Sequence, residues 1–357
     1  MESGAGGLPS VKRRNFLKTM AASATIPPAD GPLLTAESRP RTSMGVVQYS
    51  FSGSPHTRSA YDFLEYCSSL GAGGIQIGLD SLDAGYLAKL RRRTSELGMY
   101  LEVTVSLPQR DDSADFERHV AAAQQAGAQC LRSACLNGRR YENFSSLDQW
   151  KDFVTDSHQR IAQAVPILEK HRMPLGLENH KDWTADEMAA LLERHASEYL
   201  GVCLDTGNNI SLLDDPLDVI GKLAPYAVTT HFKNMALKDY PEGFLLSEVP
   251  LDQGFLDPSW VVDSIRKARP RARLNLEMIT RDPLKVPCLT DKYWVTFPER
   301  NGVYLARTLA LVREHPPREP LPHVSDLGDA ARHQQEEDNV KQCLAYAGEK
   351  LGLRAAS

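Results

Sequence analysis

The chain lacks several features that would assign it to a class of protein at once. Its six cysteines form no Cys-x-x-Cys pair and show no zinc-finger spacing, which excludes a redox motif and a structural zinc finger. No segment approaches the roughly 18 consecutive apolar residues of a membrane span. The 41 basic residues are outnumbered by 46 acidic ones, so the net charge of −5 gives no overall attraction for nucleic acid or for an anionic membrane. We therefore expect neither of them as a partner.

The first residues differ from the rest of the chain. Overall, 42% of the 357 residues are hydrophobic and 24% are charged, which is ordinary for a globular protein with a sizeable core. Residues 12–18, Lys-Arg-Arg-Asn-Phe-Leu-Lys, resemble a twin-arginine export signal, and small residues follow at 19–25. We predict that residues 1–43 are a signal and leader and that the protein is periplasmic or exported. The alternative is a disordered basic tail on a cytoplasmic protein.

From Met44 onward, short β-rich runs alternate with amphipathic helical stretches. Eight such units fill residues 44–314, which predicts a (β/α)8 TIM barrel. An open doubly wound sheet is the competing fold, but the glycine-rich phosphate turn that usually follows its first strand is absent. The predicted strands are 44–49, 74–77, 100–104, 129–132, 174–178, 200–205, 227–231 and 273–277. The predicted helices are 59–70, 81–97, 112–126 and 146–171, followed by helices beginning near Thr184, Asp215, Asp257 and Phe297.

The composition changes after residue 314. Residues 315–322 form a proline-rich connector, and a charged helical stretch follows at 325–351. We predict that residues 315–357 are a C-terminal extension whose helix packs on the outside of the barrel or on a neighbouring subunit. The sequence thus leaves a homo-oligomer open.

Four strand-like segments in the second half each end on a side chain that binds metals. They end on Glu178, Asp205, His231 and Glu277. Taken singly, such a carboxylate can cap a helix and such a histidine can be a core residue. The carboxyl ends of successive strands, however, meet at one mouth of a parallel barrel. Carboxylates with one imidazole suit a divalent ion such as Mn²⁺, Mg²⁺, Co²⁺ or Zn²⁺, so we predict one such ion as the cofactor.

These four residues lie in segments that resemble a known family, the xylose-isomerase-like TIM barrels of the sugar phosphate isomerase/epimerase superfamily. The resemblance covers residues from about 44 to 313. Members include ketose epimerases, aldose–ketose isomerases and decarboxylases of oxo sugar acids, and the zinc endonucleases of abasic DNA share the fold. The segments that carry the resemblance are Leu177-Glu-Asn-His180, Leu204-Asp-Thr-Gly-Asn208, Thr230-His-Phe-Lys233 and Leu276-Glu-Met-Ile279.

The resemblance implies that two of the metal ligands also move protons. In the epimerases, the carboxylates that correspond to Glu178 and Glu277 lie on opposite faces of the substrate. A carboxylate ligand beside an acidified carbon-bound proton is a well-placed base. The alternative is a purely ligating pair, with the chemistry supplied by His180 or Lys233. Each of these lies two residues beyond a ligand, so on extended backbone it faces the same side as that ligand.

Further polar residues are candidates for binding the substrate. Arg132 ends the fourth predicted strand, while Arg281 and Lys285 lie in a long segment after Glu277 that is a candidate lid. Cationic residues at the mouth of an acidic protein suggest a carboxylate or phosphate on the substrate. Asn208 is a candidate partner for a sugar hydroxyl, and Glu102 on the third strand is a candidate for the pocket lining.

We therefore expect a metal-dependent sugar isomerase or epimerase that acts on a keto-sugar or sugar acid through an enediolate. The alternative is a metal-dependent decarboxylase or lyase of a 3-oxo sugar acid or keto-glycoside. A more remote alternative is a phosphodiesterase of the abasic-site endonuclease kind, which requires a histidine-rich zinc site and a basic groove. Only His180 and His231 fall at predicted strand ends. A sugar-binding protein without catalysis has no need of the four ligands.

Overall fold

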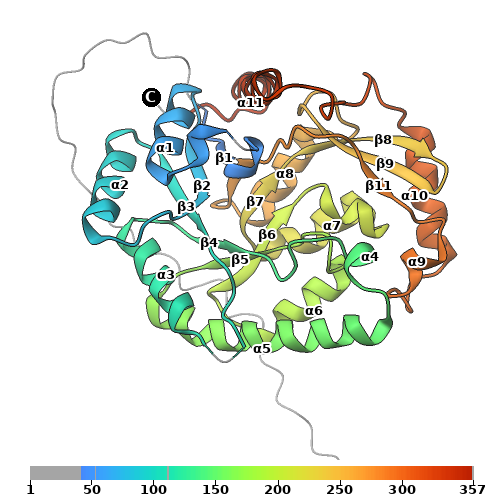
Figure 1. Ribbon diagram of the computed structural model, residues 1–357, viewed down its shortest axis with the longest axis horizontal. Helices are drawn as coiled ribbons and strands as arrows, with labels where there is room; N and C mark the ends of the chain where they lie inside the picture. Colours follow the sequence, from blue (N-terminus) through green and yellow to red (C-terminus); the bar gives the residue numbers. More distant parts are fainter. Residues whose placement is uncertain (1–41, 53, 111, 356–357) are drawn as a thin grey trace, which may run out of the picture. The chain divides into compact units, whose positions relative to one another are not determined.

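The computed structural model describes residues 42–52, 54–110 and 112–355, and the predicted export signal lies outside them. Eight parallel strands close into a barrel in the order β1-β10-β7-β6-β5-β4-β3-β2 (Figure 1). The predicted TIM barrel is confirmed. Its strands are β1 (Gly45–Val47), β2 (Gly74–Gly78), β3 (Tyr100–Thr104), β4 (Leu131–Ser133), β5 (Leu175–Glu178), β6 (Leu200–Asp205), β7 (Ala227–Phe232) and β10 (Arg273–Leu276).

The helices around the barrel begin and end at residues that the sequence marks. Thr184 and Glu187 form a reciprocal capping box at the start of α6. Gly71, Gly98 and Gly127 follow the first three helices with φ values of 86°, 61° and 80°, a conformation that glycine adopts without strain. These helices are α1 (Ala60–Ser69), α2 (Ala84–Glu96), α3 (Ala114–Gln125), α5 (Leu147–His171), α6 (Ala185–His195), α7 (Pro216–Leu223) and α8 (Pro258–Ala268), with a short α4 (Arg140–Asn143) before α5.

The barrel interior is filled by side chains. Every residue of β5 and β6 is buried, because the helices cover one face of the strands and the interior packing covers the other. Near the amino-terminal ends of the strands, the Tyr100 ring occupies space that a Cβ atom at Gly45 or Gly74 would take. Its hydroxyl donates a hydrogen bond to Asn275 Oδ1 at 3.0 Å. Side chains therefore fill this end of the barrel interior.

A second, smaller sheet lies beside the barrel. It is antiparallel, in the order β11-β9-β8, and consists of β8 (Asn234–Tyr240), β9 (Gly243–Val249) and β11 (Leu284–Val286). The hairpin of β8 and β9 accounts for the long interval between His231 and Glu277. The helix α10 (Gly302–Glu314) contacts β8 and β9, and the short α9 (Asp291–Trp294) precedes it (Figure 1).

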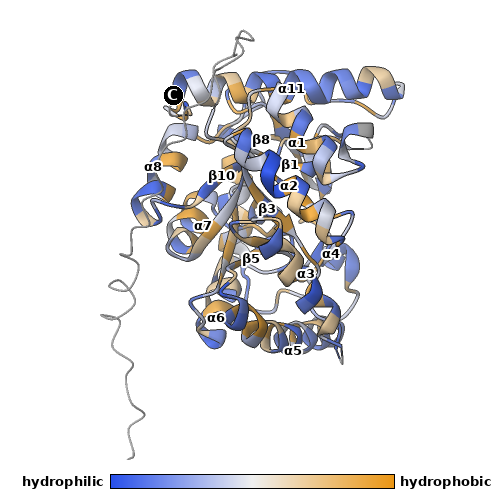
Figure 2. Cartoon of the chain, turned by 90° about the vertical axis from the view of Figure 1, so that its left-hand side faces the viewer, coloured by the Kyte–Doolittle hydropathy of each residue, from blue (hydrophilic) through white to orange (hydrophobic). Residues whose placement is uncertain are grey.

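The C-terminal helix α11 (Asp329–Lys350) packs against the barrel, as predicted for the extension. Its apolar side chains belong to the main hydrophobic core, among them Val340, Cys343 and Leu344. On α1, the Tyr66 hydroxyl donates to Glu337 Oε2 at 2.6 Å. Both views show α11 beside α1, and much of its surface is hydrophilic (Figure 2). A helix does begin near Phe297, at Gly302, but it packs on the second sheet, while α11 packs next to α1.

Two further observations concern features from which the sequence predicts no function, namely the cysteines and the hydrophobic segments. All six cysteines are buried free thiols, so the structure contains no disulfide among them. None of the helices in the described part of the chain is long and apolar enough to cross a membrane.

Candidate metal centre

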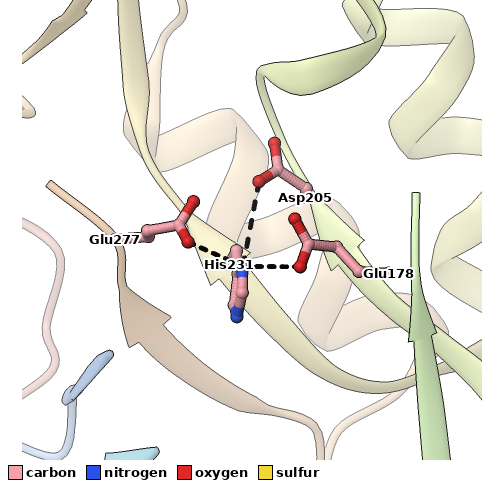
Figure 3. Close-up of side chains that lie close together, drawn as sticks. All are labelled: Glu178, Asp205, His231 and Glu277. Atoms are coloured by element: carbon pink, nitrogen blue, oxygen red, sulfur yellow. Dashed lines mark ion pairs between the residues drawn. The ribbon is translucent and has the colours of Figure 1, made fainter. Parts of the chain in front are cut away.

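Four side chains converge at the carboxyl ends of four neighbouring strands. Glu178 ends β5, Asp205 ends β6, His231 lies near the end of β7, and Glu277 directly follows β10. Each offers one ligand atom, and these atoms lie within 4.8 Å of one another. Figure 3 shows the three carboxylates arranged around the imidazole of His231. The structure thus brings together the four residues that the sequence predicts as metal ligands.

The His231 ring is oriented by a residue that the sequence analysis missed. Its Nε2 atom is 2.6 Å from Gln76 Oε1, while the Gln76 amide nitrogen donates to Glu102 Oε2 at 2.9 Å. Gln76 therefore presents its oxygen to the ring, so Nε2 carries the proton. The other nitrogen, Nδ1, then faces Glu178 Oε2 at 3.3 Å and Glu277 Oε1 at 3.2 Å.

The centre fits a divalent cation. His231 Nδ1 is buried and has no hydrogen-bond partner among the described residues, although three carboxylates surround it. Burial opposes a positive charge on this ring, but the Cys203 thiol and the carboxylates of Glu277 and Glu178 outweigh burial and raise the pKa of His231 well above its ordinary value. Three carboxylate oxygens and one imidazole nitrogen are a donor set for Mg²⁺, Mn²⁺, Co²⁺ or Zn²⁺.

Two buried cations hold the glutamate ligands. Arg132, at the middle of β4, donates from Nε to Glu178 Oε2 at 2.8 Å. Lys233 Nζ contacts Glu277 Oε2 and lies 2.8 Å from Asp205 Oδ2. Burial opposes the charge of Lys233, but Asp205 and Glu277 outweigh it and raise its pKa. Both cations were predicted to act at the site, Arg132 on the substrate and Lys233 as a catalytic group. The structure places both directly on the ligands.

Asn208 connects one of the ligands to two lysines. Its amide nitrogen donates to Glu178 Oε1 at 2.9 Å, and its Oδ1 atom accepts from Lys181 and, at 3.4 Å, from Lys233. The predicted contact of Asn208 with a sugar hydroxyl stays a prediction, since its oxygen is already engaged. Lys181 was missed, because the sequence does not reveal that this loop residue is buried.

His180 lies in the loop after β5, two residues beyond Glu178, and its catalytic role stays a prediction. Its side chain is half-buried, and its Nδ1 atom has no hydrogen-bond partner among the residues that the structure describes. Burial, followed by the charge of Lys181, lowers the pKa of His180 to about 3. The ring is therefore neutral at physiological pH, a state in which one nitrogen donates and the other accepts.

Glu102 occupies a different place from the one predicted. Its side chain is completely buried in the barrel, where Oε2 accepts hydrogen bonds from Gln76, from Thr229 at 2.6 Å and from Asn275 at 2.9 Å. The prediction that Glu102 lines the substrate pocket is not supported. The residue instead holds Gln76 against His231. Its pKa is raised because burial disfavours the ionised carboxyl group.

The two predicted cations after Glu277 lie on opposite sides of the second sheet. Arg281 donates from Nε to Glu248 Oε2 at 3.1 Å, and Glu248 lies on β9 with its side chain buried. Lys285 pairs with Leu245 of β9, three residues from Glu248, so it lies on the other face of the sheet. There it is exposed over the ring of Tyr240. The structure does not bring Lys285 to the metal centre.

Comparison with curated proteins finds relatives of moderate similarity. The chain is 27% identical over 234 residues to a 3-oxo-isoapionate decarboxylase of Pectobacterium atrosepticum, an alignment that covers 62% of this chain and 80% of that protein. It is also 22% identical over 170 residues to the uncharacterized protein YihM of Escherichia coli, with 48% of each chain covered.

Solved structures share the fold at low sequence identity. A D-psicose 3-epimerase crystallised in the presence of D-fructose superposes with a TM-score of 0.58 at 15% identity, covering 87% of this chain and 99% of the epimerase. A xylose isomerase-like TIM barrel protein of Mycobacterium smegmatis in complex with magnesium has a TM-score of 0.51 at 16% identity, covering 74% and 97%. The IOLI protein with a zinc atom bound has a TM-score of 0.51 at 14% identity, covering 75% and 97%.

The family of the chain is assigned from a sequence match that extends well beyond the individual motifs. The profile described as xylose isomerase-like TIM barrel matches residues 64–294, well over half of the chain. This range includes all four residues of the metal centre. The chain therefore belongs to the xylose isomerase-like TIM barrel family.

Proposed function

We propose that the protein is a divalent-metal-dependent enzyme that converts a keto-sugar or an oxo sugar acid through an enediolate. The observation that carries the proposal is that one ligand atom each of Glu178, Asp205, His231 and Glu277 lies within 4.8 Å of the others at the carboxyl ends of the barrel strands. A cation held there would polarise the carbonyl and a neighbouring hydroxyl of the substrate and so favour loss of a group from the adjacent carbon. Fold neighbours that hold magnesium or zinc support this choice of cofactor.

Decarboxylation of a 3-oxo sugar acid is the reaction that the charges around the centre support best. Each glutamate ligand contacts a buried cation, Glu178 with Arg132 and Glu277 with Lys233. A nearby positive charge stabilises a carboxylate and makes it a weaker base. This arrangement disfavours removal of a carbon-bound proton. Loss of CO₂ requires no base, because the electron pair of the breaking C–C bond passes into the carbonyl group.

The residues of the site then have distinct roles. Arg132 and Lys233 keep the two glutamates ionised and in place, and Gln76 holds the His231 ring in the orientation that points Nδ1 at them. After CO₂ leaves, one proton is added to the carbon that carried it. Lys233, which is protonated, is the candidate donor of this proton. The similarity to a 3-oxo-isoapionate decarboxylase supports the same reaction class.

Epimerisation or isomerisation is the second candidate. It is favoured by the placement of Glu178 and Glu277 on either side of His231, because two carboxylates on opposite sides of a substrate can remove a proton from one face and return one to the other (Figure 3). The single histidine of the centre and the net charge of −5 give no such support to a phosphodiesterase.

One experiment separates the two reactions. The protein, loaded in turn with Mn²⁺, Mg²⁺, Co²⁺ and Zn²⁺, is incubated in D₂O with oxo sugar acids and with neutral keto-sugars. Decarboxylation releases CO₂ into an alkaline trap and leaves one deuterium in the product, as read by NMR. Epimerisation introduces deuterium without release of CO₂. Absence of both reactions across these substrates and metals would overturn the proposal.

We further propose that the enzyme acts after export, on the basis of the pair Arg13-Arg14 within its amino-terminal segment. Fractionation of cells that express the chain, compared with an Arg13→Lys, Arg14→Lys variant, tests this. Equal amounts of both proteins in the periplasm would contradict the proposal.

A further inference from the structure

Lys181 is a buried cation without a counter-ion. Its exposed fraction is 4%, and its ammonium group donates to the neutral Oδ1 atom of Asn208. Over residues 42–52, 54–110 and 112–355, no carboxylate lies within the 4.0 Å that defines an ion pair with Lys181. The buried cations Arg132 and Lys233 and the half-buried Arg281 all have such a partner: Arg132 has Glu178, Lys233 has Asp205 and Glu277, and Arg281 has Glu248.

A buried charge that lacks a partner is destabilising, so it is rarely kept without a function. Lys181 lies close enough to Lys233 and Arg281 for them to repel its charge. Burial, followed by this repulsion, lowers the pKa of Lys181 to about 8. Glu248 offers only weak compensation, because its carboxylate is bound by Arg281. Within the described residues, the charge of Lys181 is therefore left unbalanced.

The position of Lys181 connects this missing anion to the metal centre. The residue lies three positions after Glu178, in the loop that follows β5. It shares Oδ1 of Asn208 with Lys233, and the other end of the same amide donates to Glu178. An anion bound to Lys181 would consequently lie next to the ligands that hold the cation.

We propose that Lys181 binds the carboxylate of an acidic substrate at the mouth of the barrel. This inference rests on the proposed function, because it assumes that the substrate occupies the metal centre. A carboxylate is favoured over a phosphate because one unpaired lysine balances one negative charge, whereas a phosphate carries close to two. The residue is thereby a determinant of the preference for oxo sugar acids over neutral keto-sugars.

The test compares three small probes on the full-length chain. Glycerate carries a carboxylate, glycerol 3-phosphate a phosphate, and glycerol no charge. Binding is measured by calorimetry and by the shift in Tm, with Mn²⁺ loaded and again after its removal with EDTA, so that binding to the metal is separated from binding to Lys181. The variants are Lys181→Met, which removes the charge at similar volume, and Lys181→Arg, which keeps it. Lys151→Met, on the exposed surface of α5, is the control.

We expect wild type to bind glycerate more tightly than the other two probes. Lys181→Met should weaken glycerate binding about tenfold or more, because a charge-assisted hydrogen bond is lost, while Lys181→Arg should retain most of it. Without any probe, Lys181→Met should have a Tm about 2 °C or more above that of wild type, because an unpaired buried charge is gone. A lysine with a purely structural role would show the opposite change in Tm.

Two results would overturn the proposal: glycerate binding that is unchanged in Lys181→Met, or a lower Tm of the probe-free variant. Tighter binding of glycerol 3-phosphate than of glycerate would overturn the choice of a carboxylate. Release of CO₂ by wild-type protein is measured on the same preparations. If no substrate is decarboxylated or epimerised while glycerate still binds through Lys181, the proposed function fails and the anion site stands.

Discussion

The interior of the barrel and its mouth differ in how fully their buried polar groups are paired. In the interior, Glu102 Oε2 accepts hydrogen bonds from Gln76, Thr229 and Asn275. At the mouth, His231 Nδ1 has no hydrogen-bond partner and Lys181 no counter-ion among the described residues. The two layers are only two residues apart along β7 and β10, about 6–7 Å. In the interior only Glu102 Oε1 of this network has no partner among the described residues, whereas the mouth leaves both a ring nitrogen and an ammonium charge without one.

The energetics make this difference informative. A fully paired buried network stabilises one arrangement of side chains, while a half-paired one costs more than apolar residues would. The protein accepts this cost at the mouth, where a cation and an anion would complete the pairing. The cost is smaller two residues deeper, where three hydrogen bonds hold Glu102 Oε2 and only its Oε1 atom is left without a partner. Breaking each layer should therefore have different consequences.

The largest effect is expected for a ligand of the mouth. Glu277→Gln removes one carboxylate from the metal centre and leaves Lys233 with Asp205 as its remaining close partner. Turnover should fall by roughly 10²–10⁴-fold, because the cation loses a ligand and Lys233, a candidate proton donor, loses one of its two close partners. Turnover is measured by CO₂ release and NMR, metal content by elemental analysis, and the fold by circular dichroism. Glu142→Gln, an exposed carboxylate on α4, is the control, and turnover like wild type in Glu277→Gln would refute the assignment.

The next effect concerns stability and pH. The pKa of Lys181 is lowered from 10.5 to about 8 by burial and by Lys233 and Arg281, while Glu248 and Asp205 oppose the shift. Between these two values the unfolded chain binds a proton that the folded chain does not, so wild-type stability gains with rising pH. Below about pH 8, Lys181→Met should be more stable than wild type by roughly 3 kcal/mol.

Urea unfolding without metal or anion, from pH 7 to pH 10.5, measures this difference. The advantage of Lys181→Met should shrink through this range and become small by pH 10.5, where the lysine is neutral in the folded chain and half protonated in the unfolded chain. An advantage that is constant with pH would show that packing, and not the charge, separates the two proteins.

A third change tests the connection between the layers. Gln76→Leu leaves His231 Nε2 without its acceptor and removes one donor from Glu102. We expect metal affinity to fall 10–100-fold, as is typical when the residue that orients a ligand is lost. Gln129→Leu, which breaks an exposed hydrogen bond to Arg273, is the matched control. Competition for metal with a fluorescent chelator measures the affinity, and an unchanged value in Gln76→Leu would show that the layers are independent.

The sequence predicts the metal ligands well because of a general property of parallel barrels. The apolar run before each of Glu178, Asp205 and His231 identifies a strand, and the carboxyl end of each strand lies at the mouth of the barrel. Glu102 was misplaced because alternation along a strand tells which side chains point inward but not how deep they lie. It is the third of five residues in β3, so it points into the interior below the mouth.

Other parts of the site depend on contacts that no local pattern contains. The hairpin that carries Glu248 lies within the interval between His231 and Glu277, where the sequence analysis identified no strands. Gln76 and Lys181 are ordinary polar residues in the sequence, and their roles arise from burial and from partners more than 25 positions away. The position of α11 next to α1 likewise depends on which helix packs over that part of the hydrophobic core, and no local pattern in the sequence shows this.

The smallest effect is expected from Ser50, which ends a short 3-10 helix (Gln48–Ser50) after β1. Its buried hydroxyl donates to the carbonyl of Leu276 at 3.3 Å and accepts from the amide of Met278 at 3.1 Å, the two neighbours of Glu277. Ser50→Ala removes both bonds and should lower stability by about 1–3 kcal/mol and metal affinity a few-fold, because Glu277 is held less firmly. Ser69→Ala, at an exposed hydroxyl of α1, is the control. A loss of stability with unchanged metal affinity would place Ser50 with the interior, whose bonds maintain the fold alone, and not with the mouth.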